Sequence, residues 1–139
     1  DGDRIMAVFI GNYKNTNAAK AAFQLKWAVP NIVTPAMRRI YPNVDFALKH
    51  VCGIDTSELL VAKTGVRGAN DLVWVGRAAN YAAKLSALPP SYTYITQPVY
   101  NKLNDEIKVK AGESIWQRVR WDTFNDTTIF RSSWHWSID

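Results

Sequence analysis

Short segments of apolar or alternating residues recur along this chain, separated by residues that favour turns. Segments of this kind predict β-strands, and turn residues between consecutive strands predict hairpins. The expected strands are residues 5–10, 44–54, 58–63, 72–75, 92–95, 115–121 and 127–138. The Asp55-Thr56-Ser57 turn is expected to join the second strand to the third, and residues 124–126 to join the last two. Antiparallel pairs are therefore predicted to form most of the sheet.

Amphipathic stretches interrupt these strand candidates. Apolar residues at the i, i+3, i+4, i+7 spacing predict a helix over residues 18–29, which Pro30 is expected to end or kink. Residues 32–41 are expected to add a second helical piece, residues 76–88 a further helix, and Thr96 to cap a short one. Strands mixed with helices predict an α+β fold, with helices on one face of a mostly antiparallel sheet.

The composition is that of one ordinary globular domain. Its 139 residues have the usual size of a single domain, so residues 1–139 are expected to form one. The 17 Lys and Arg against 12 Asp and Glu give a formal net charge of +5, which favours anionic partners. The basic residues are scattered, which argues against a tail that coats nucleic acid. No apolar run approaches the roughly 20 residues that span a bilayer. Cys52 stands alone, so no intrachain disulfide is possible, which fits a reducing cytosol.

The predicted helix over residues 76–88 carries an unusual polar stripe. Arg77, Asn80 and Lys84 are spaced by three and then four residues, so they lie on one helix face. The stripe begins near the helix N-terminus, where free N–H groups favour an anion. Two cations and an amide donor there suit a phosphate or a developing negative charge. A solvated helix face has the same spacing and is the alternative interpretation.

Two carboxylates precede the first strand candidate. Asp1 and Asp3 flank Gly2 directly before residues 5–10. Carboxylates at the mouth of a strand suit Mg²⁺ or Mn²⁺, which take a few oxygen ligands together with substrate phosphates. Asp-Gly is also common turn chemistry, so a plain turn is the alternative interpretation.

Further candidates are three arginines and one histidine. Arg118, Arg120 and Arg131 in the last hairpin are either contacts for the distal phosphates of a nucleotide or solvated cross-strand charges. His50 lies on an apolar strand face and is expected to be a core histidine.

Three motifs follow one another in the order of a known family. Residues 1–9 read DGDRIMAVF, residues 51–57 read VCGIDTS, and residues 73–76 read VWVG with Asn80 and Lys84 behind them. They resemble the metal-binding hairpin, the Val-Gly-Ile-Asp-Thr-Gly hairpin and the Gly-x-x-x-Asn-x-Ala-x-Arg block of class III adenylyl and guanylyl cyclases. Ser57 stands where that family usually has Gly. The resemblance covers residues 1–88 and implies a ferredoxin-like, class III cyclase fold.

The resemblance implies roles for several residues. Asp3 matches one of the two aspartates that hold a pair of catalytic Mn²⁺ or Mg²⁺ ions. Asn80 matches the asparagine that orients the ribose and stabilises the transition state. Lys84 stands where the family has a transition-state arginine, which keeps the charge but loses the planar donor. Arg77 lies where many members have Asp, and it is expected to take over part of the catalytic work.

Residues 70–77 look similar to the bacterial pyrimidine cyclases of the Pycsar antiphage system, which make cyclic UMP or cyclic CMP from UTP or CTP. Val73 occupies the position that reads the purine in adenylyl cyclases, and its side chain has no group to hydrogen-bond a base edge. This resemblance assigns Asn70, Asp71, Val73 and Trp74 to substrate binding. It implies UTP as the substrate and the second messenger cUMP as the product, with cyclisation of CTP or ATP as the alternatives.

The same resemblance implies a head-to-tail homodimer with shared active sites, to which one subunit brings Asp3 and the other Asn80. The second metal aspartate is expected on a strand before Asp1, so the domain is expected to be incomplete at its N-terminus. No nucleic-acid or membrane partner is expected, and the protein is expected in the cytoplasm. A catalytically inactive module for nucleotide binding or dimerisation is the alternative from another functional class.

Overall fold

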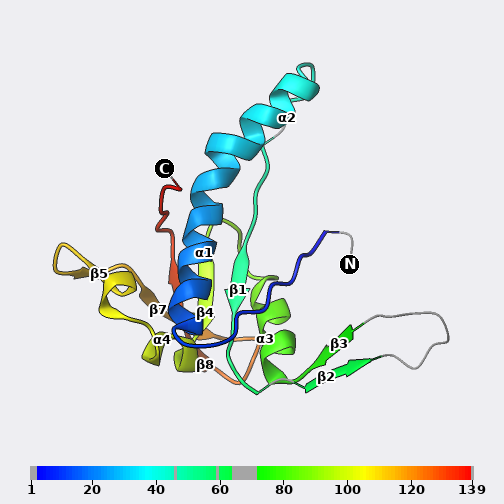
Figure 1. Cartoon of the computed structure of the whole chain (residues 1–139). Coiled ribbons are helices and arrows are strands. Elements are labelled where there is room, and N and C mark those ends of the chain that lie inside the picture. Colours follow the sequence, from blue (N-terminus) through cyan, green and yellow to red (C-terminus); the bar gives the residue numbers. More distant parts are fainter. Residues whose placement is uncertain (1–2, 46, 59, 64–71, 139) are drawn as a thin grey trace.

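A four-stranded sheet forms the centre of the computed structural model, which describes residues 3–45, 47–58, 60–63 and 72–138 (Figure 1). Its strands lie in the order β1 (Cys52–Ile54), β4 (Thr93–Thr96), β8 (Thr127–Ser132) and β7 (Gln117–Trp121). β1 pairs with β4 in parallel, and the other neighbours are antiparallel. The predicted last hairpin and the mostly antiparallel sheet of an α+β fold are therefore confirmed.

Two small hairpins stand apart from this sheet. The strands of the first are β2 (Leu60–Lys63) and β3 (Leu72–Val75), and those of the second are β5 (Val109–Lys110) and β6 (Glu113–Ser114). In Figure 1 the β2–β3 hairpin extends away from the body of the molecule. A short helix, α4 (Gln97–Asn101), follows Thr96, and a 3-10 turn covers Asp105–Ile107. Thr96 has the predicted N-cap position, but its side chain makes no capping hydrogen bond, because its hydroxyl donates to Asp55.

A continuous helical rod runs along the sheet and projects beyond it (Figure 1). Its parts are α1 (Lys14–Ala28), a π-helical turn (Val29–Val33) and α2 (Thr34–Ile40). Pro30 has no N–H and therefore makes no helical hydrogen bond to the residue four positions back. The turn widens instead, and the amide of Thr34 donates to the carbonyl of Val29. Pro30 thus changes the helix type without ending the rod.

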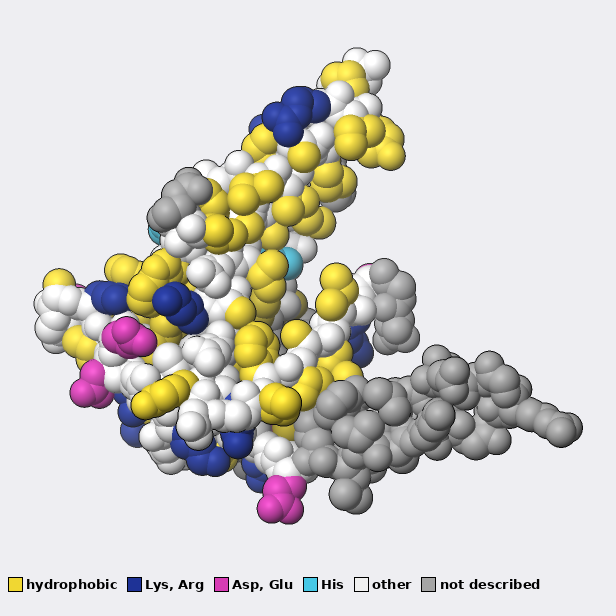
Figure 2. Space-filling view, in the orientation of Figure 1, with side chains coloured by type: hydrophobic (Ala, Val, Ile, Leu, Met, Phe, Trp, Pro, Cys, Tyr) yellow, Lys and Arg dark blue, Asp and Glu magenta, His cyan; other side chains and the backbone are white. Residues whose placement is uncertain are grey.

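The projecting part of the rod is rich in exposed apolar side chains. Ile32, Ile40 and Tyr41 are all exposed, and Figure 2 shows hydrophobic side chains along this end of the molecule. No helix among the described residues combines the length and the apolar character that crossing a membrane requires.

The face of the sheet beneath α1 carries the larger apolar core. Phe23 and Ala19 of α1 are fully buried there, against Ile95 of β4 and Phe130 of β8. The indole of Trp116 packs on Phe23 with ring centroids 5.2 Å apart, and its N–H donates to the carbonyl of Ile107 at 2.8 Å. The amphipathic helix predicted over residues 18–29 is confirmed, with its buried stripe on the sheet.

The opposite face of the sheet is covered as well. Side chains alternate between the two faces of a strand, and Tyr94 precedes Ile95 on β4 just as Ile129 precedes Phe130 on β8. Tyr94 and Ile129 form a second buried cluster with Trp121 and with Leu85 of α3 (Arg77–Leu85). The prediction of helices on one face is therefore wrong, because α1 and α3 cover opposite faces.

The predicted strand over residues 5–10 is also wrong. Residues 4–10 are in no strand, and Ile5 and Ile10 are 96% and 83% exposed. A strand exists through hydrogen bonds to a neighbouring strand, and none of the described strands pairs with this segment. An apolar run alone was not sufficient to place it in the sheet.

The first predicted hairpin has different partners. Among the described residues of 44–54 only β1 is a strand, and β2 pairs with β3 through the register Leu60↔Val75 instead of returning along β1. The turn after β1 contacts the start of α3 through Ser57 and Asp55. The turn therefore packs against the N-terminus of α3 and does not join β1 to β2 as a hairpin.

We expect Phe23→Ala to lower the free energy of unfolding by about 3–4 kcal/mol, because the side chain is fully buried and leaves a cavity. Leu25→Ala is the matched control on the same helix. Leu25 is 52% exposed, so its truncation should cost no more than about 0.5 kcal/mol. Urea denaturation followed by circular dichroism measures both, and equal losses would contradict the described packing.

Candidate active site

The polar stripe of α3 faces solvent. Arg77, Asn80 and Lys84 are exposed, whereas Ala78 and Leu85 on the other side of the helix are buried. The structure therefore brings the three predicted catalytic side chains together on one accessible face.

The helix α3 packs very closely on the strand β1. A Cβ built on Gly53 of β1 would collide with the carbonyl oxygen of Ala82 and would lie 2.7 Å from the Cβ of Leu85. Only glycine therefore lets the backbone of α3 rest directly on β1. The VCGIDTS motif thus sets the depth at which α3 packs.

The N-terminus of α3 is capped from a distant turn. Gly76 at the N-cap position has no side chain for this purpose, and the hydroxyl of Ser57 accepts a hydrogen bond from the amide of Ala78 at 3.0 Å. Serine in the position where the cyclase family usually has glycine therefore has a structural use here: it satisfies one of the free amides at the helix start.

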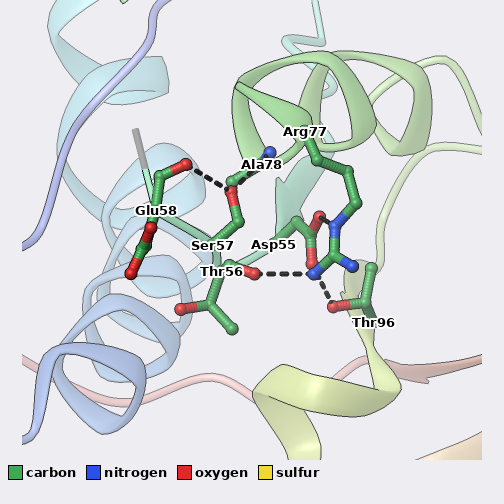
Figure 3. A network of polar contacts seen from close by, with 7 residues as sticks. All are labelled: Asp55, Thr56, Ser57, Glu58, Arg77, Ala78 and Thr96. Carbon is green, nitrogen blue, oxygen red and sulfur yellow. Dashed lines mark hydrogen bonds and ion pairs between the residues drawn. The ribbon is translucent and has the colours of Figure 1, made fainter. Parts of the chain in front are cut away.

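An ion pair with a buried carboxylate also holds the start of the helix (Figure 3). The Nε atom of Arg77 lies 3.3 Å from Oδ2 of Asp55, and an Nη atom donates to the carbonyl of Thr56 at 2.9 Å. The hydroxyl of Thr96 donates to Oδ1 of Asp55 at 2.5 Å. Oδ2 is buried, and none of the described residues donates a hydrogen bond of good geometry to it. The positive charge of Arg77 therefore compensates the charge of this oxygen.

The ion pair gives Arg77 a structural role. The Asp55 side chain is wholly buried and that of Arg77 is 48% exposed, so the guanidinium spans the interior and the surface. One edge of the guanidinium is occupied by Asp55 and Thr56 of the turn after β1. Arg77 is thus a positioning residue for the stripe, and its predicted direct part in catalysis stays a prediction.

Two aromatic rings surround the other cation of the stripe. The ammonium of Lys84 lies 4.5 Å from the ring centre of Phe124 and 5.9 Å from that of Tyr81. Tyr81 and Phe124 meet edge to face at 4.9 Å, and Arg77 lies 5.6 Å from the Tyr81 ring. These rings restrict Lys84 through cation–π attraction. Sequence reasoning missed both rings, although Tyr81 lies at helical spacing from Arg77 and Lys84.

The predicted substrate-binding residues are only partly described. Asn70 and Asp71 lie outside the described residues. Val73 and Trp74 are on β3, where they pair with Ala62 and Val61 of β2. β3 leads through Gly76 directly into α3, so the predicted base-reading strand and the catalytic stripe are adjacent along the chain.

The described residues do not form a complete metal site. Asp3 is exposed, but it precedes a segment without regular secondary structure and not the predicted strand. Among the described residues no group of three or more His, Cys, Asp or Glu side chains could hold a metal ion. A single carboxylate does not fit a pair of divalent cations by itself, so Asp3 would need ligands from elsewhere.

Curated proteins named "Uridylate cyclase" are similar to this chain along nearly its whole length, although no protein-family model matches it. Identity to the protein of Xanthomonas perforans is 63% over 139 residues, covering 100% of this chain and 60% of that protein. For Burkholderia cepacia it is 51% over 138 residues, covering 99% and 59%. For Rhodovulum sp. (strain MB263) it is 35% over 142 residues, covering 96% and 59%. The chain thus spans about 60% of the length of these relatives.

We expect Arg77→Met to destabilise the fold by about 1–2 kcal/mol, because it leaves the Asp55 carboxylate buried and unpaired. The loss is smaller than for a fully buried pair, since half of Arg77 lies in solvent. The double variant Asp55→Ala/Arg77→Met should lose at least about 0.5 kcal/mol less than the sum of the single losses. Lys84→Met on the same helix face is the control and should change stability by no more than about 0.5 kcal/mol. Strict additivity in urea denaturation would contradict the ion pair.

Proposed function

We propose that this chain is the larger part of the catalytic domain of a nucleotidyl cyclase that converts UTP to cUMP and pyrophosphate. The observation that carries the proposal is the 63% identity, over the whole of this chain, to a protein named uridylate cyclase. The anchored and exposed stripe of Asn80 and Lys84 supports it, because it provides an amide donor and a cation on one rigid surface.

In this proposal the 3′-hydroxyl of the ribose attacks the α-phosphorus, the hydroxyl proton leaves, and the bond to pyrophosphate breaks. Asn80 orients the ribose and donates to the charge that develops on the phosphoryl oxygens. Lys84 supplies a positive charge to the same region, and its contacts with Phe124 and Tyr81 reduce the ammonium's freedom before the substrate arrives. Preorganised groups of this kind act mainly on the transition state.

The remaining parts of the site follow from the resemblance. Two divalent cations, Mn²⁺ or Mg²⁺, are proposed to bind with Asp3 as one ligand, and when bound such ions activate the hydroxyl and neutralise phosphate charge. Asn70, Asp71, Val73 and Trp74 are proposed to contact the substrate. Val73 is compatible with a pyrimidine because it provides no group for a purine edge.

We further propose an assembly for the cyclase and a role for its product. A head-to-tail homodimer would place Asp3 of one subunit and Asn80 of the other in one site. The cUMP product would act as a second messenger in antiphage defence, in the cytoplasm, and the cyclase reaction would involve neither nucleic acid nor a membrane. These statements rest on the resemblance and on the similarity to uridylate cyclases.

Removing the side chain of Asn80 or of Lys84 from the stripe should slow turnover. We expect Asn80→Ala and Lys84→Met in the complete protein to lower kcat by about 10²–10³ with little change in KM, as for interactions made in the transition state. Lys84→Arg should keep activity because it retains the charge. Steady-state kinetics of cUMP formation measure these effects. Unchanged turnover in Asn80→Ala would show that the stripe is only a solvated helix face, and no turnover in the unmodified complete protein would favour a module without catalysis.

A competition among the four ribonucleoside triphosphates with Mn²⁺ tests the base. UTP should be consumed first, followed by CTP, and a clear preference for ATP or GTP would contradict the pyrimidine assignment.

The shared site can be tested by mixing two inactive variants, Asp3→Ala and Asn80→Ala. Half of the sites in a mixed dimer then retain both residues, so part of the activity should return. Each variant incubated alone is the control. If mixed dimers form and no activity returns, the site is not built from two subunits.

A further inference from the structure

A cationic cavity lies at the junction of α1, the π-helical turn and α2, and it shares no residue with the stripe on α3. Its volume is about 560 Å³. Thirteen of the described residues line it, from the rod, from residues 47–50 and from two single positions, Ser91 and His135.

The charge of this lining has one sign. Lys26, Arg38 and Lys49 contribute three cations, and both histidines of the chain, His50 and His135, lie beside them. None of the described residues that line the cavity is an aspartate or a glutamate. Like charges gathered without a counter-charge repel one another, and a bound anion removes that cost.

The state of His50 is consistent with a positive interior. Sequence reasoning placed His50 in the core, but the side chain is half-buried and faces the cavity. Burial, and then the nearby charge of Lys26, lower the pKa of His50 below its ordinary value. The imidazole is therefore neutral at pH 7 and keeps one N–H donor beside the cations.

One face of the helical rod lines the cavity. Trp27, Asn31, Thr34 and Arg38 follow one another at intervals of four, three and four residues, so they share a face. The side-chain amide of Asn31 donates to the carbonyl of Trp27 at 2.7 Å across the π-helical turn. Turns of this type often occur at functional sites. The ammonium of Lys26 is held against the carbonyl of Ser91 at 2.7 Å, which fixes it at the edge of the cavity.

An apolar part completes the lining. Trp27, Val29, Pro30 and Leu48 offer apolar and aromatic surface next to the cations. A site with convergent cations beside an aromatic ring suits a ligand that has an anionic group on a flat or apolar body.

We propose that this cavity binds a phosphate monoester of a small apolar or aromatic molecule, with the phosphate at Arg38 and Lys49 and the organic part against Trp27. A free solute and the headgroup of a phosphate-bearing lipid share this chemistry. The site is independent of the cyclase reaction, because its residues are distinct from Asn80 and Lys84.

Phenyl phosphate is the probe, titrated into the complete protein at low ionic strength by isothermal titration calorimetry. We expect saturable binding to one site per chain, weakened about tenfold by Arg38→Met or Lys49→Met, the effect of losing one charged contact. Arg39→Met is the matched control, since Arg39 is the next residue on α2, is also exposed and does not line the cavity. It should leave binding unchanged. Trp27→Leu should reduce the preference for phenyl phosphate over inorganic phosphate.

Two further experiments separate this site from the proposed cyclase site and a lipid ligand from a free solute. Asn80→Ala/Lys84→Met should bind phenyl phosphate as the unmodified protein does, so a failure of the cyclase proposal leaves this result intact. Vesicles of phosphatidylcholine with phosphatidic acid identify a lipid source if they bind in an Arg38-dependent way, and a free solute is the ligand if only phenyl phosphate does. Absence of saturable binding to both probes, equal weakening by Arg39→Met, or loss only in the Asn80/Lys84 variant would overturn the proposal.

Discussion

The backbone of α3 rests on β1 at Gly53, and the candidate site depends on this contact. Any side chain at that position would meet Ala82 and Leu85, so the helix would have to move outward. Such a movement would separate Leu85 from the cluster around Tyr94 and would shift every residue of the stripe. A single glycine on the buried strand thus couples the packing of the second core to the position of Asn80 and Lys84 on the surface.

The turn after β1 orients α3 through polar contacts with the start of the helix. Ser57 caps the helix, and the buried Asp55 holds Arg77 while it accepts from Thr96 on the neighbouring strand β4. A buried carboxylate is costly unless it is paired, so the fold has few alternatives that keep Asp55 satisfied. The polar network therefore fixes the rotation of α3 about its own axis, whereas Gly53 fixes its depth.

Covering the sheet on both faces separates two charged surfaces of the molecule. The stripe belongs to the helix on one face, and the cationic cavity belongs to the end of the helix on the other. The central strands β4 and β8 contribute one buried residue to each core in turn, as Tyr94 and Ile95 do. Their pleat keeps the two surfaces apart, and one rigid sheet supports both.

The sequence by itself determined the local elements and the chemistry of the stripe. The amphipathic α1, the alanine-rich α3, the final hairpin and the common face of Arg77, Asn80 and Lys84 all follow from spacing along the chain. Such features depend on neighbours three or four residues away, or on a turn of a few residues, and a sequence displays these directly. The resemblance of the ordered motifs then supplied the roles proposed for the stripe.

Only the tertiary structure decided which segments meet. Residues 5–10 have the composition of a strand but are mostly exposed, and none of the described strands pairs with them. The sequence predicted Asp55 only as part of a turn. In the fold it forms an ion pair with Arg77, which is distant along the chain. His50 and Lys26, distant in the sequence, likewise line one cavity. Pairing and burial of this kind are set by which distant surfaces can be desolvated together, and spacing along one chain contains no measure of that.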